Sequence, residues 1–389
     1  MKLNSNIELV QEIMMEFASL TGLEPINAYP KRYLWTDAFA VCNYLELFKE
    51  TRDKTYLNLA LSLVDQVHHV LGRHREDDPR NGWISGLGEE KGELHHTRGG
   101  LRIGKKMNER KVDEIPDERL EWDQDGQYYH YLTKWMHALS NVSHVTGDPK
   151  YARWAVELAK NVHEKFTYVP SSGMQKRMYW KMSIDLSYPL VTSMGQHDPL
   201  DGFITYNELQ MRVDKLELLP EFDLSTEITD MKTICQGKSW TTNDPLGIGG
   251  LLSDALRISQ LIVTDNLRYG NLLETVVSSA LIGMKYFELK NSLKYPAKYR
   301  LAFRELGLSI GLKGVRKLLD LVDKNKHLFR NGSLKQQVEA LIEYVPIGES
   351  IEKFWIKNKN RETVSWRDHQ EINMVMLATS IIPEGFLMI

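Results

Sequence analysis

Apolar residues recur at three- and four-residue steps along most of the chain, a spacing typical of amphipathic helices. Leu59, Leu63, Val64, Val67 and Val70 follow it closely. The same period predicts helices over residues 7–21, 127–146, 245–264, 267–288, 297–323, 333–344 and 367–380. No alternating run of comparable length predicts a strand. We therefore expect an all-α chain.

An internal repeat indicates how the helices are paired. Residues 44–68 align with residues 139–163, and three matched pairs mark the turn: Thr51 with Thr146, Asp53 with Asp148, and Tyr56 with Tyr151. An aspartate at this place can cap the free N–H groups of a following helix, and Pro149 is tolerated at a first helical position. Each copy therefore predicts two antiparallel helices joined by a short turn.

Repeated hairpins form either an open superhelix or a closed ring. A weaker third copy spans Leu261 to Phe287. The three copies are diverged and are separated by long, unequal insertions rich in Gly, His, Trp and Asp, which favours a ring with long loops at one mouth. No Pro/Ser/Gly-rich linker divides the 389 residues. We expect one domain over residues 1–389, with a loop or lid insertion at about residues 74–120.

The composition of the chain excludes some classes of binding partner. A formal net charge of −3 leaves no basic field for nucleic acid, and no apolar run is long enough for a membrane span. The first ten residues lack the pattern of a secretory signal. Cys42 lies in an apolar helical pattern and Cys235 lies far away in a mixed segment, so the two cysteines do not indicate a disulfide framework. We expect a cytoplasmic protein acting on a small saccharide, with a homo-oligomer possible.

Five segments combine carboxylates, imidazoles and aromatic rings near predicted helix starts. They supply the candidate catalytic carboxylates, Asp37, Asp125, Asp198 and Asp201, and the candidate substrate-binding residues, Trp35, Trp83, Trp122, Asp123, His130, His197 and His369. The segment 193–202 is the strongest, because two carboxylates flank a proline-containing turn with glycines on both sides. Helix capping and core packing are the alternative roles for each of these residues.

Neither a metal nor a cofactor is expected. The histidines at 68–69, 74 and 95–96 include adjacent pairs that point in different directions on a helix, and no H-E-x-x-H motif occurs. His68 matches His163 in the repeat, which indicates a structural position. The glycines at 86–88 and 99–100 do not follow a strand of a βαβ unit, as a dinucleotide loop would.

The arrangement resembles the six-hairpin glycosidase-like superfamily. The resemblance lies in the Trp35-Thr36-Asp37 segment, the Thr-x-Asp-x-x-Tyr turns at 51–56 and 146–151, and the aromatic–acid loops at 121–130 and 193–202. It implies an all-α (α/α)6 toroid, a central funnel lined by inner-helix ends, and a sugar substrate.

Three functions remain open at this point. The first is inverting glycoside hydrolysis by paired carboxylates, with Asp198 or Asp201 opposite Asp125 or Asp37. The second is sugar isomerisation or epimerisation, in which His130, His197 and His369 would move protons beside a carbonyl. The third is a non-catalytic helical-repeat protein that binds a partner on its concave surface.

Overall fold

The computed structural model describes residues 2–171, 173, 175–265, 267–329 and 332–389. The chain forms two compact units. Unit 1 holds residues 1–20, 49–51 and 238–389, and unit 2 holds residues 21–48 and 52–237. The expectation of one domain over residues 1–389 stays a prediction.

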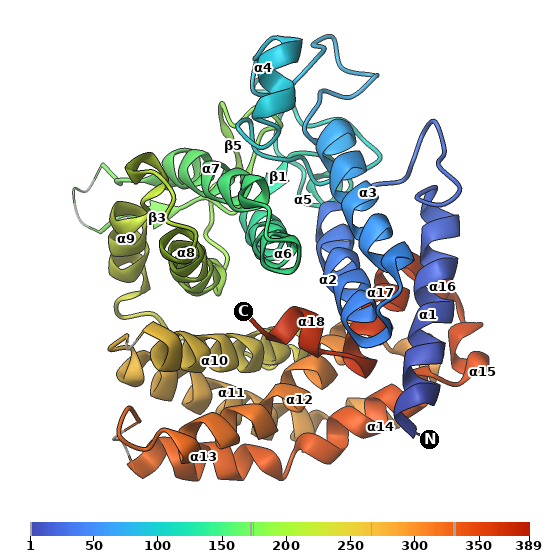
Figure 1. The fold of residues 1–389 in the computed structure, drawn as a ribbon, viewed down its shortest axis with the longest axis vertical. Helices are drawn as coiled ribbons and strands as arrows, with labels where there is room; N and C mark the ends of the chain where they lie inside the picture. The colour runs from blue at the N-terminus through green and yellow to red at the C-terminus, as the bar shows by residue number, and fades with distance from the viewer. Residues whose placement is uncertain (1, 172, 174, 266, 330–331) are drawn as a thin grey trace. The chain divides into compact units, whose positions relative to one another are not determined.

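Unit 2 is built from helical hairpins (Figure 1). Its main helices are α2 (Leu34–Thr51), α3 (Lys54–Leu71), α6 (Tyr129–Thr146), α7 (Pro149–Phe166), α8 (Asp198–Lys215) and α9 (Ser225–Cys235). The short helices α4 (Glu89–Leu94) and α5 (Glu118–Glu121) lie in the long connection between α3 and α6. The prediction of a mostly helical chain is confirmed.

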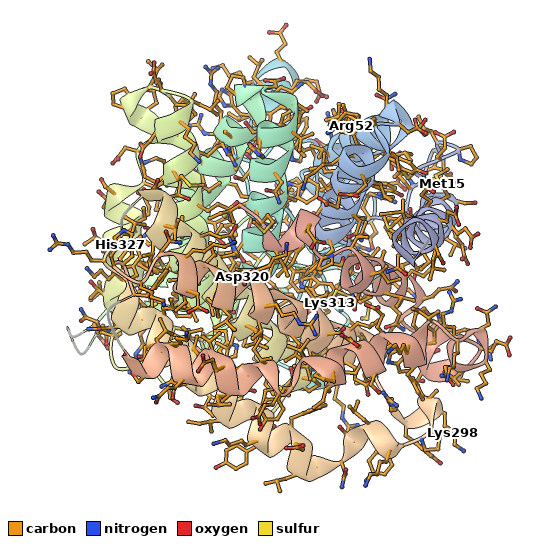
Figure 2. The ribbon with its side chains drawn as sticks, turned by 60° about the horizontal axis from the view of Figure 1, so that its bottom comes forward. Met15, Arg52, Lys298, Lys313, Asp320 and His327 are labelled. Carbon is orange, nitrogen blue, oxygen red and sulfur yellow. The ribbon has the colours of Figure 1, made fainter. Side chains whose placement is uncertain are left out.

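The repeat has the same turn in both copies. Arg52, labelled in Figure 2, and Gly147 follow α2 and α6 in left-handed conformation, with φ of 62° and 73°. Asp53 and Asp148 then cap α3 and α7, and each carboxylate accepts a 2.9 Å hydrogen bond from the backbone N–H two residues on. The predicted capped turns are confirmed, and they fix the two helices of each hairpin antiparallel.

Helices α2, α6 and α8 are buried around most of their circumference, whereas α3 and α7 bury one face. In α2 every residue from Leu34 to Leu47 is buried. Such helices must satisfy their own polar groups, because an unpaired polar atom away from water is costly. Accordingly, the buried Glu208 of α8 accepts a 2.9 Å hydrogen bond from the His137 ring of α6.

Two small sheets hold the chain just before α6 and after α7. In the first, β1 (Gln127–Tyr128) pairs with β4 (Lys181–Met182), and β4 pairs with β5 (Pro189–Val191), all antiparallel. In the second, β2 (Thr167–Tyr168) pairs with β3 (Arg177–Met178). The sequence did not predict these strands, since two or three residues are too short to show an alternating pattern.

The connection between α3 and α6 is tied to unit 2 by two buried side chains. The Gln127 amide donates to the carbonyls of Gly99 and Ile184 and accepts from the Leu101 N–H. The Asp125 carboxylate is fully buried and pairs with Arg102 at 2.9 Å. Residues 99–103 of the predicted lid are therefore packed into unit 2, while residues 76–77, 88–91 and 111–117 are exposed.

Unit 1 consists of a second set of packed helices. They are α1 (Lys2–Thr21), α10 (Pro245–Asp265), α11 (Gly270–Lys290), α12 (Ala302–Lys324), α13 (Gly332–Ile342), α14 (Val345–Trp355), α15 (Asn358–Arg361), α16 (Val364–Arg367), α17 (Gln370–Ile381) and α18 (Glu384–Leu387). Three 3-10 turns, Pro220–Phe222 in unit 2 and Ser292–Lys294 and Ala297–Tyr299 in unit 1, complete the described elements. The helix predicted from residue 297 thus begins at Ala302.

Helices α10 and α12 pack backbone to backbone. A Cβ added at Gly249 would lie 2.0 Å from the Gly307 carbonyl oxygen, and one added at Gly311 would lie 2.4 Å from the Gly249 carbonyl oxygen. Among the described residues, α10 is long and apolar enough to cross a membrane, judged by length and composition alone. However, 78% of its most apolar window is buried in the structure, so packing accounts for its apolar side chains.

Helices α12 and α14 of unit 1 are also linked by charge. Lys313, labelled on α12 in Figure 2, pairs with Glu352 of α14.

Helix α14 was not predicted from the sequence, nor were α9 and the body of α8.

Candidate active site

The first turns of α2, α6 and α8 meet in unit 2. Tyr33, just before α2, donates or accepts a 2.7 Å hydrogen bond with the hydroxyl of Tyr131 in α6. The Trp35 ring of α2 also lies 6.4 Å from the Tyr131 ring. On the other side, the His130 ring of α6 lies 3.6 Å from the Asp198 carboxylate of α8. Two of the segments predicted from sequence, 121–130 and 193–202, are thus in contact.

Aromatic side chains form a continuous row beside these helix starts. The ring centroids of Tyr33 and Tyr131 are 5.6 Å apart, and those of Tyr131 and His130 are 4.8 Å apart. Trp180, between β3 and β4, stacks on His130 with the planes 15° apart. Trp122 is 55% exposed and meets Trp180 edge to face at 5.4 Å. We call these five residues the aromatic row; flat, partly exposed rings of this kind can stack on the apolar face of a sugar.

His130 and Asp198 contain buried polar atoms with no hydrogen-bond partner in the described structure. These atoms are Nδ1 of the imidazole and Oδ2 of the carboxylate. The Asp198 side chain is 7% exposed and that of His130 is 31% exposed. A buried polar atom without a partner costs about 1–3 kcal/mol, so native proteins rarely keep two side by side without a use for them. An imidazole beside a carboxylate can transfer a proton to or from a bound molecule.

Gly195 makes room for this carboxylate. A Cβ added there would lie 2.5 Å from Cγ and both oxygens of Asp198, closer than Cβ atoms approach other atoms in real proteins. Steric exclusion of a side chain therefore explains why a glycine stands at position 195 of the predicted segment 193–202. Its hydrogen allows the Asp198 side chain to lie against the backbone of the preceding turn.

The other predicted catalytic carboxylates are held by cations. Asp201 pairs with Lys134 at 2.7 Å and also accepts a hydrogen bond from Thr133. Asp125 pairs with Arg102 and with Arg75, the latter at 3.4 Å.

Asp37 has a more apolar environment. Burial raises the pKa of its carboxyl to about 6, although Arg32 at 3.5 Å and the N–H of Tyr33 both lower it. A carboxyl with such a pKa can carry a proton near neutral pH.

The remaining predicted residues lie in different surroundings. Trp83 is 2% exposed, and its ring stacks on His96 and lies under the Arg73 guanidinium. Asp123 is exposed. His197 is the residue before α8, next to Asp198. His369 precedes α17 in unit 1, where its ring meets that of Phe303 at 5.4 Å. The roles assigned to these residues stay predictions.

One histidine cluster has ligand atoms close enough to hold a metal ion: those of His69, Glu93 and His96 lie within 4.8 Å of one another. The hydrogen bonds of these histidines instead indicate a structural role. The Trp135 indole, a donor only, donates to Nε2 of His68, so the proton of the neutral His68 ring is on Nδ1 and points to Nδ1 of His96. The His96 proton is then on Nε2, facing Glu93 at 3.3 Å, where it blocks a metal ion. The expectation of no metal stays a prediction.

Two surface hollows of unit 2 are lined by residues outside the aromatic row. One, of about 460 Å³, is lined by residues of α7 and its surroundings, including Lys160, His163 and Lys176. The other, of about 310 Å³, is lined by Arg75, Glu76, Asp77 and Arg102. Neither is lined by His130 or Asp198, so the candidate site rests on buried unpartnered atoms and aromatic rings.

Sequence reasoning missed several members of the site. Tyr33 and Tyr131 adjoin predicted residues, and their aromatic character was a usable signal. Trp180 lies outside the predicted segments, between 121–130 and 193–202. It reaches them because β4 pairs with β1, and the pairing of strands this short could not be foreseen.

No protein-family model matches the chain, and no curated protein matches it in sequence. Among solved structures, the chain is similar to the GH76A α-1,6-mannanase from Salegentibacter sp. HEL1_6, with a TM-score of 0.53 and 11% identity over 97% of this chain and 99% of that one. This likeness is one of fold, and it confirms the predicted (α/α)6 fold class.

Two further structures are similar at lower scores. A D-mannose isomerase has a TM-score of 0.49 and 12% identity over 97% of each chain. The cellobiose 2-epimerase from Spirochaeta thermophila DSM 6192 has a TM-score of 0.48 and 10% identity over 96% of this chain and 98% of that one.

Proposed function

We propose that this chain is a carbohydrate-active enzyme, that its active site is the aromatic row together with Asp198, and that it hydrolyses a glycosidic bond. The observation that carries the proposal is a pair of neighbouring side chains, His130 and Asp198, each with a buried polar atom that has no hydrogen-bond partner in the described structure. Nδ1 of His130 lies 3.6 Å from Oδ1 of Asp198, and aromatic rings flank the pair. The fold shared with an α-1,6-mannanase supports it, although one fold can serve many reactions.

Asp198 is the proposed catalytic base. It would take a proton from water as the water oxygen bonds to the anomeric carbon, while a second carboxyl group protonates the departing oxygen and the glycosidic bond breaks. Asp37 fits the second role by its pKa of about 6. Asp125 and Asp201 are instead engaged in close ion pairs, with Arg102 at 2.9 Å and with Lys134 at 2.7 Å.

A sugar isomerase or epimerase is the second candidate, and the position of His130 favours it. An imidazole next to a carboxylate can remove a proton from the carbon beside a sugar carbonyl and return it to a neighbouring position, while the carboxylate orients the ring. In this reaction His130 would be the essential group and Asp198 its partner.

One experiment separates the two reactions. The purified protein is incubated in deuterated water with a panel of oligosaccharides and free reducing sugars, and products are followed by NMR. New reducing ends that disappear in Asp198→Asn support hydrolysis. Deuterium entering a free sugar without cleavage, lost in His130→Gln, supports isomerisation.

The control variant is Asp113→Asn, which changes an exposed aspartate outside the site and should leave activity unchanged. If every sugar in a broad panel remains untouched by the folded wild-type protein, the proposal of a carbohydrate-active enzyme is wrong.

A further inference from the structure

Lys105 lies beside Tyr33, at one end of the aromatic row. Its ammonium nitrogen is 5.4 Å from the centre of the Tyr33 ring. From there the row runs through Tyr131 to His130 and Asp198. A cation and a carboxylate thus lie at the two ends of a short, ring-lined path.

The backbone around Lys105 is fixed from several sides. The Ile103 carbonyl accepts from the N–H of Leu34 at the start of α2, and the Gly104 N–H donates to the buried Asp125 carboxylate. The Arg75 guanidinium donates to the carbonyl of Lys105 itself. This half-buried lysine is therefore on a constrained segment, so its side chain has a defined place beside Tyr33.

Neighbouring cations have carboxylate partners, whereas Lys105 has none among the described residues. Arg102 pairs with Asp125, and Lys181 pairs with Glu121. Both of these acids are shared with a second cation, since Asp125 also meets Arg75 and Glu121 also meets Arg110. Arg75 has Asp77 as a further partner, so these four cations share three carboxylates.

The described charges on this side of the site are therefore in positive excess, and Lys105 adds to it. Its charge acts on Lys181, whose pKa is lowered first by burial and also by Lys105. An ammonium group in such surroundings attracts an anion.

We propose that Lys105 is a specificity residue that selects saccharides carrying a negative charge, with a uronic acid carboxylate as the group bound over Tyr33. This inference rests on the proposed function and names the substrate class of the same site. The sugar ring would lie along the aromatic row, and its carboxylate would be next to Lys105 and away from the like-charged Asp198. A sugar phosphate offers the same kind of anion, so the test includes both.

The test compares matched sugars and matched variants. Binding of glucose, glucuronic acid and glucose 6-phosphate is measured by calorimetry, and turnover is measured on cellobiose and on the disaccharide with glucuronic acid in place of one glucose. In wild type we expect at least about tenfold tighter binding of glucuronic acid than of glucose, with the preference falling as salt screens the charge.

Three variants assign the effect. Lys105→Gln should remove the preference by weakening the acidic sugar about tenfold, mainly in KM, while neutral sugars are unaffected. Lys105→Arg should retain most of the preference. Lys106→Gln, which changes the exposed neighbouring lysine, should behave as wild type.

The outcomes are distinguishable from those for the proposed function. Turnover of neutral sugars without a preference for either anion, or an equal loss on all sugars in Lys105→Gln, overturns the inference about Lys105 alone. A preference for glucose 6-phosphate over glucuronic acid overturns the choice of a carboxylate. Absence of binding and turnover with every sugar overturns the proposed function as well.

Discussion

Replacing Gly195 by alanine tests whether the position of Asp198 matters for catalysis. The added Cβ would lie 2.5 Å from the carboxylate atoms, whereas ordinary contact begins at 3.4 Å. The backbone of Gly195 lies outside the left-handed region, so alanine is not strained by its own conformation. The carboxylate should move by about 1 Å, and a misplacement of this size in an active site costs roughly 100-fold in rate.

We therefore expect Gly195→Ala to lower kcat about 100-fold with little change in KM, while overpacking costs about 1–3 kcal/mol of stability. The assay is turnover of the best sugar from the panel, with thermal unfolding recorded for each variant. Gly88→Ala is the control, because a Cβ at Gly88 meets no heavy atom within 4 Å.

A double-mutant cycle shows whether Gly195 acts through Asp198. If it does, Gly195→Ala should cost nothing more in a protein that already carries Asp198→Asn, because the displaced group is no longer functional. A Gly195→Ala enzyme that keeps wild-type kcat, or losses that simply add in the double variant, would refute the reasoning.

Other predictions concern pH, binding and stability. Asp37→Asn should change the pH dependence of unfolding. The folded pKa of about 6 exceeds the unfolded value of 3.8, so the contribution of Asp37 to stability is lost as pH rises from 4 to 7. Over that range the variant should gain about 2 kcal/mol relative to wild type in urea titrations. A flat difference would show that Asp37 is already ionised at pH 4. Trp180→Ala should weaken binding of the best sugar about tenfold by calorimetry, and unchanged binding would remove Trp180 from the site. His68→Leu leaves the Trp135 indole N–H without its acceptor and should lower the free energy of unfolding by about 1–3 kcal/mol, and an unchanged urea midpoint would contradict the hydrogen-bond chain.

Helices with a clear apolar face and capped turns could be predicted from the sequence. The Asp148-Pro149 pair and the repeated spacing of Val and Leu gave α3, α6 and α7 correctly. The body of α8 could not be predicted in this way. It is buried on nearly all sides and contains Glu208 and Arg212 among its buried residues, so no amphipathic period is visible.

The types of residue in the candidate site could be predicted from the sequence, but the ion pairs of its carboxylates could not. The sequence brought Asp125, Asp198 and Asp201 forward as candidate acids and favoured the segment that holds the last two, but it did not show which of the three has a cation partner. Their difference depends on partners such as Lys134, which lies on another helix than Asp201 and meets it only in the folded chain. Ion pairs between distant residues leave no local pattern, so the sequence could not show which carboxylate lacks a cation partner.

The chemistry of unit 2 lies in first turns and preceding loops, whereas the helix bodies behind them are packed. Tyr33 and Tyr128 are the residues before α2 and α6, and His130 and Asp198 lie in the first turns of α6 and α8, ahead of the buried helix bodies. This separation has an evolutionary consequence. Substitutions that alter the substrate need not lower fold stability, so descendants of such a chain can acquire new specificities while the helical hairpins stay the same.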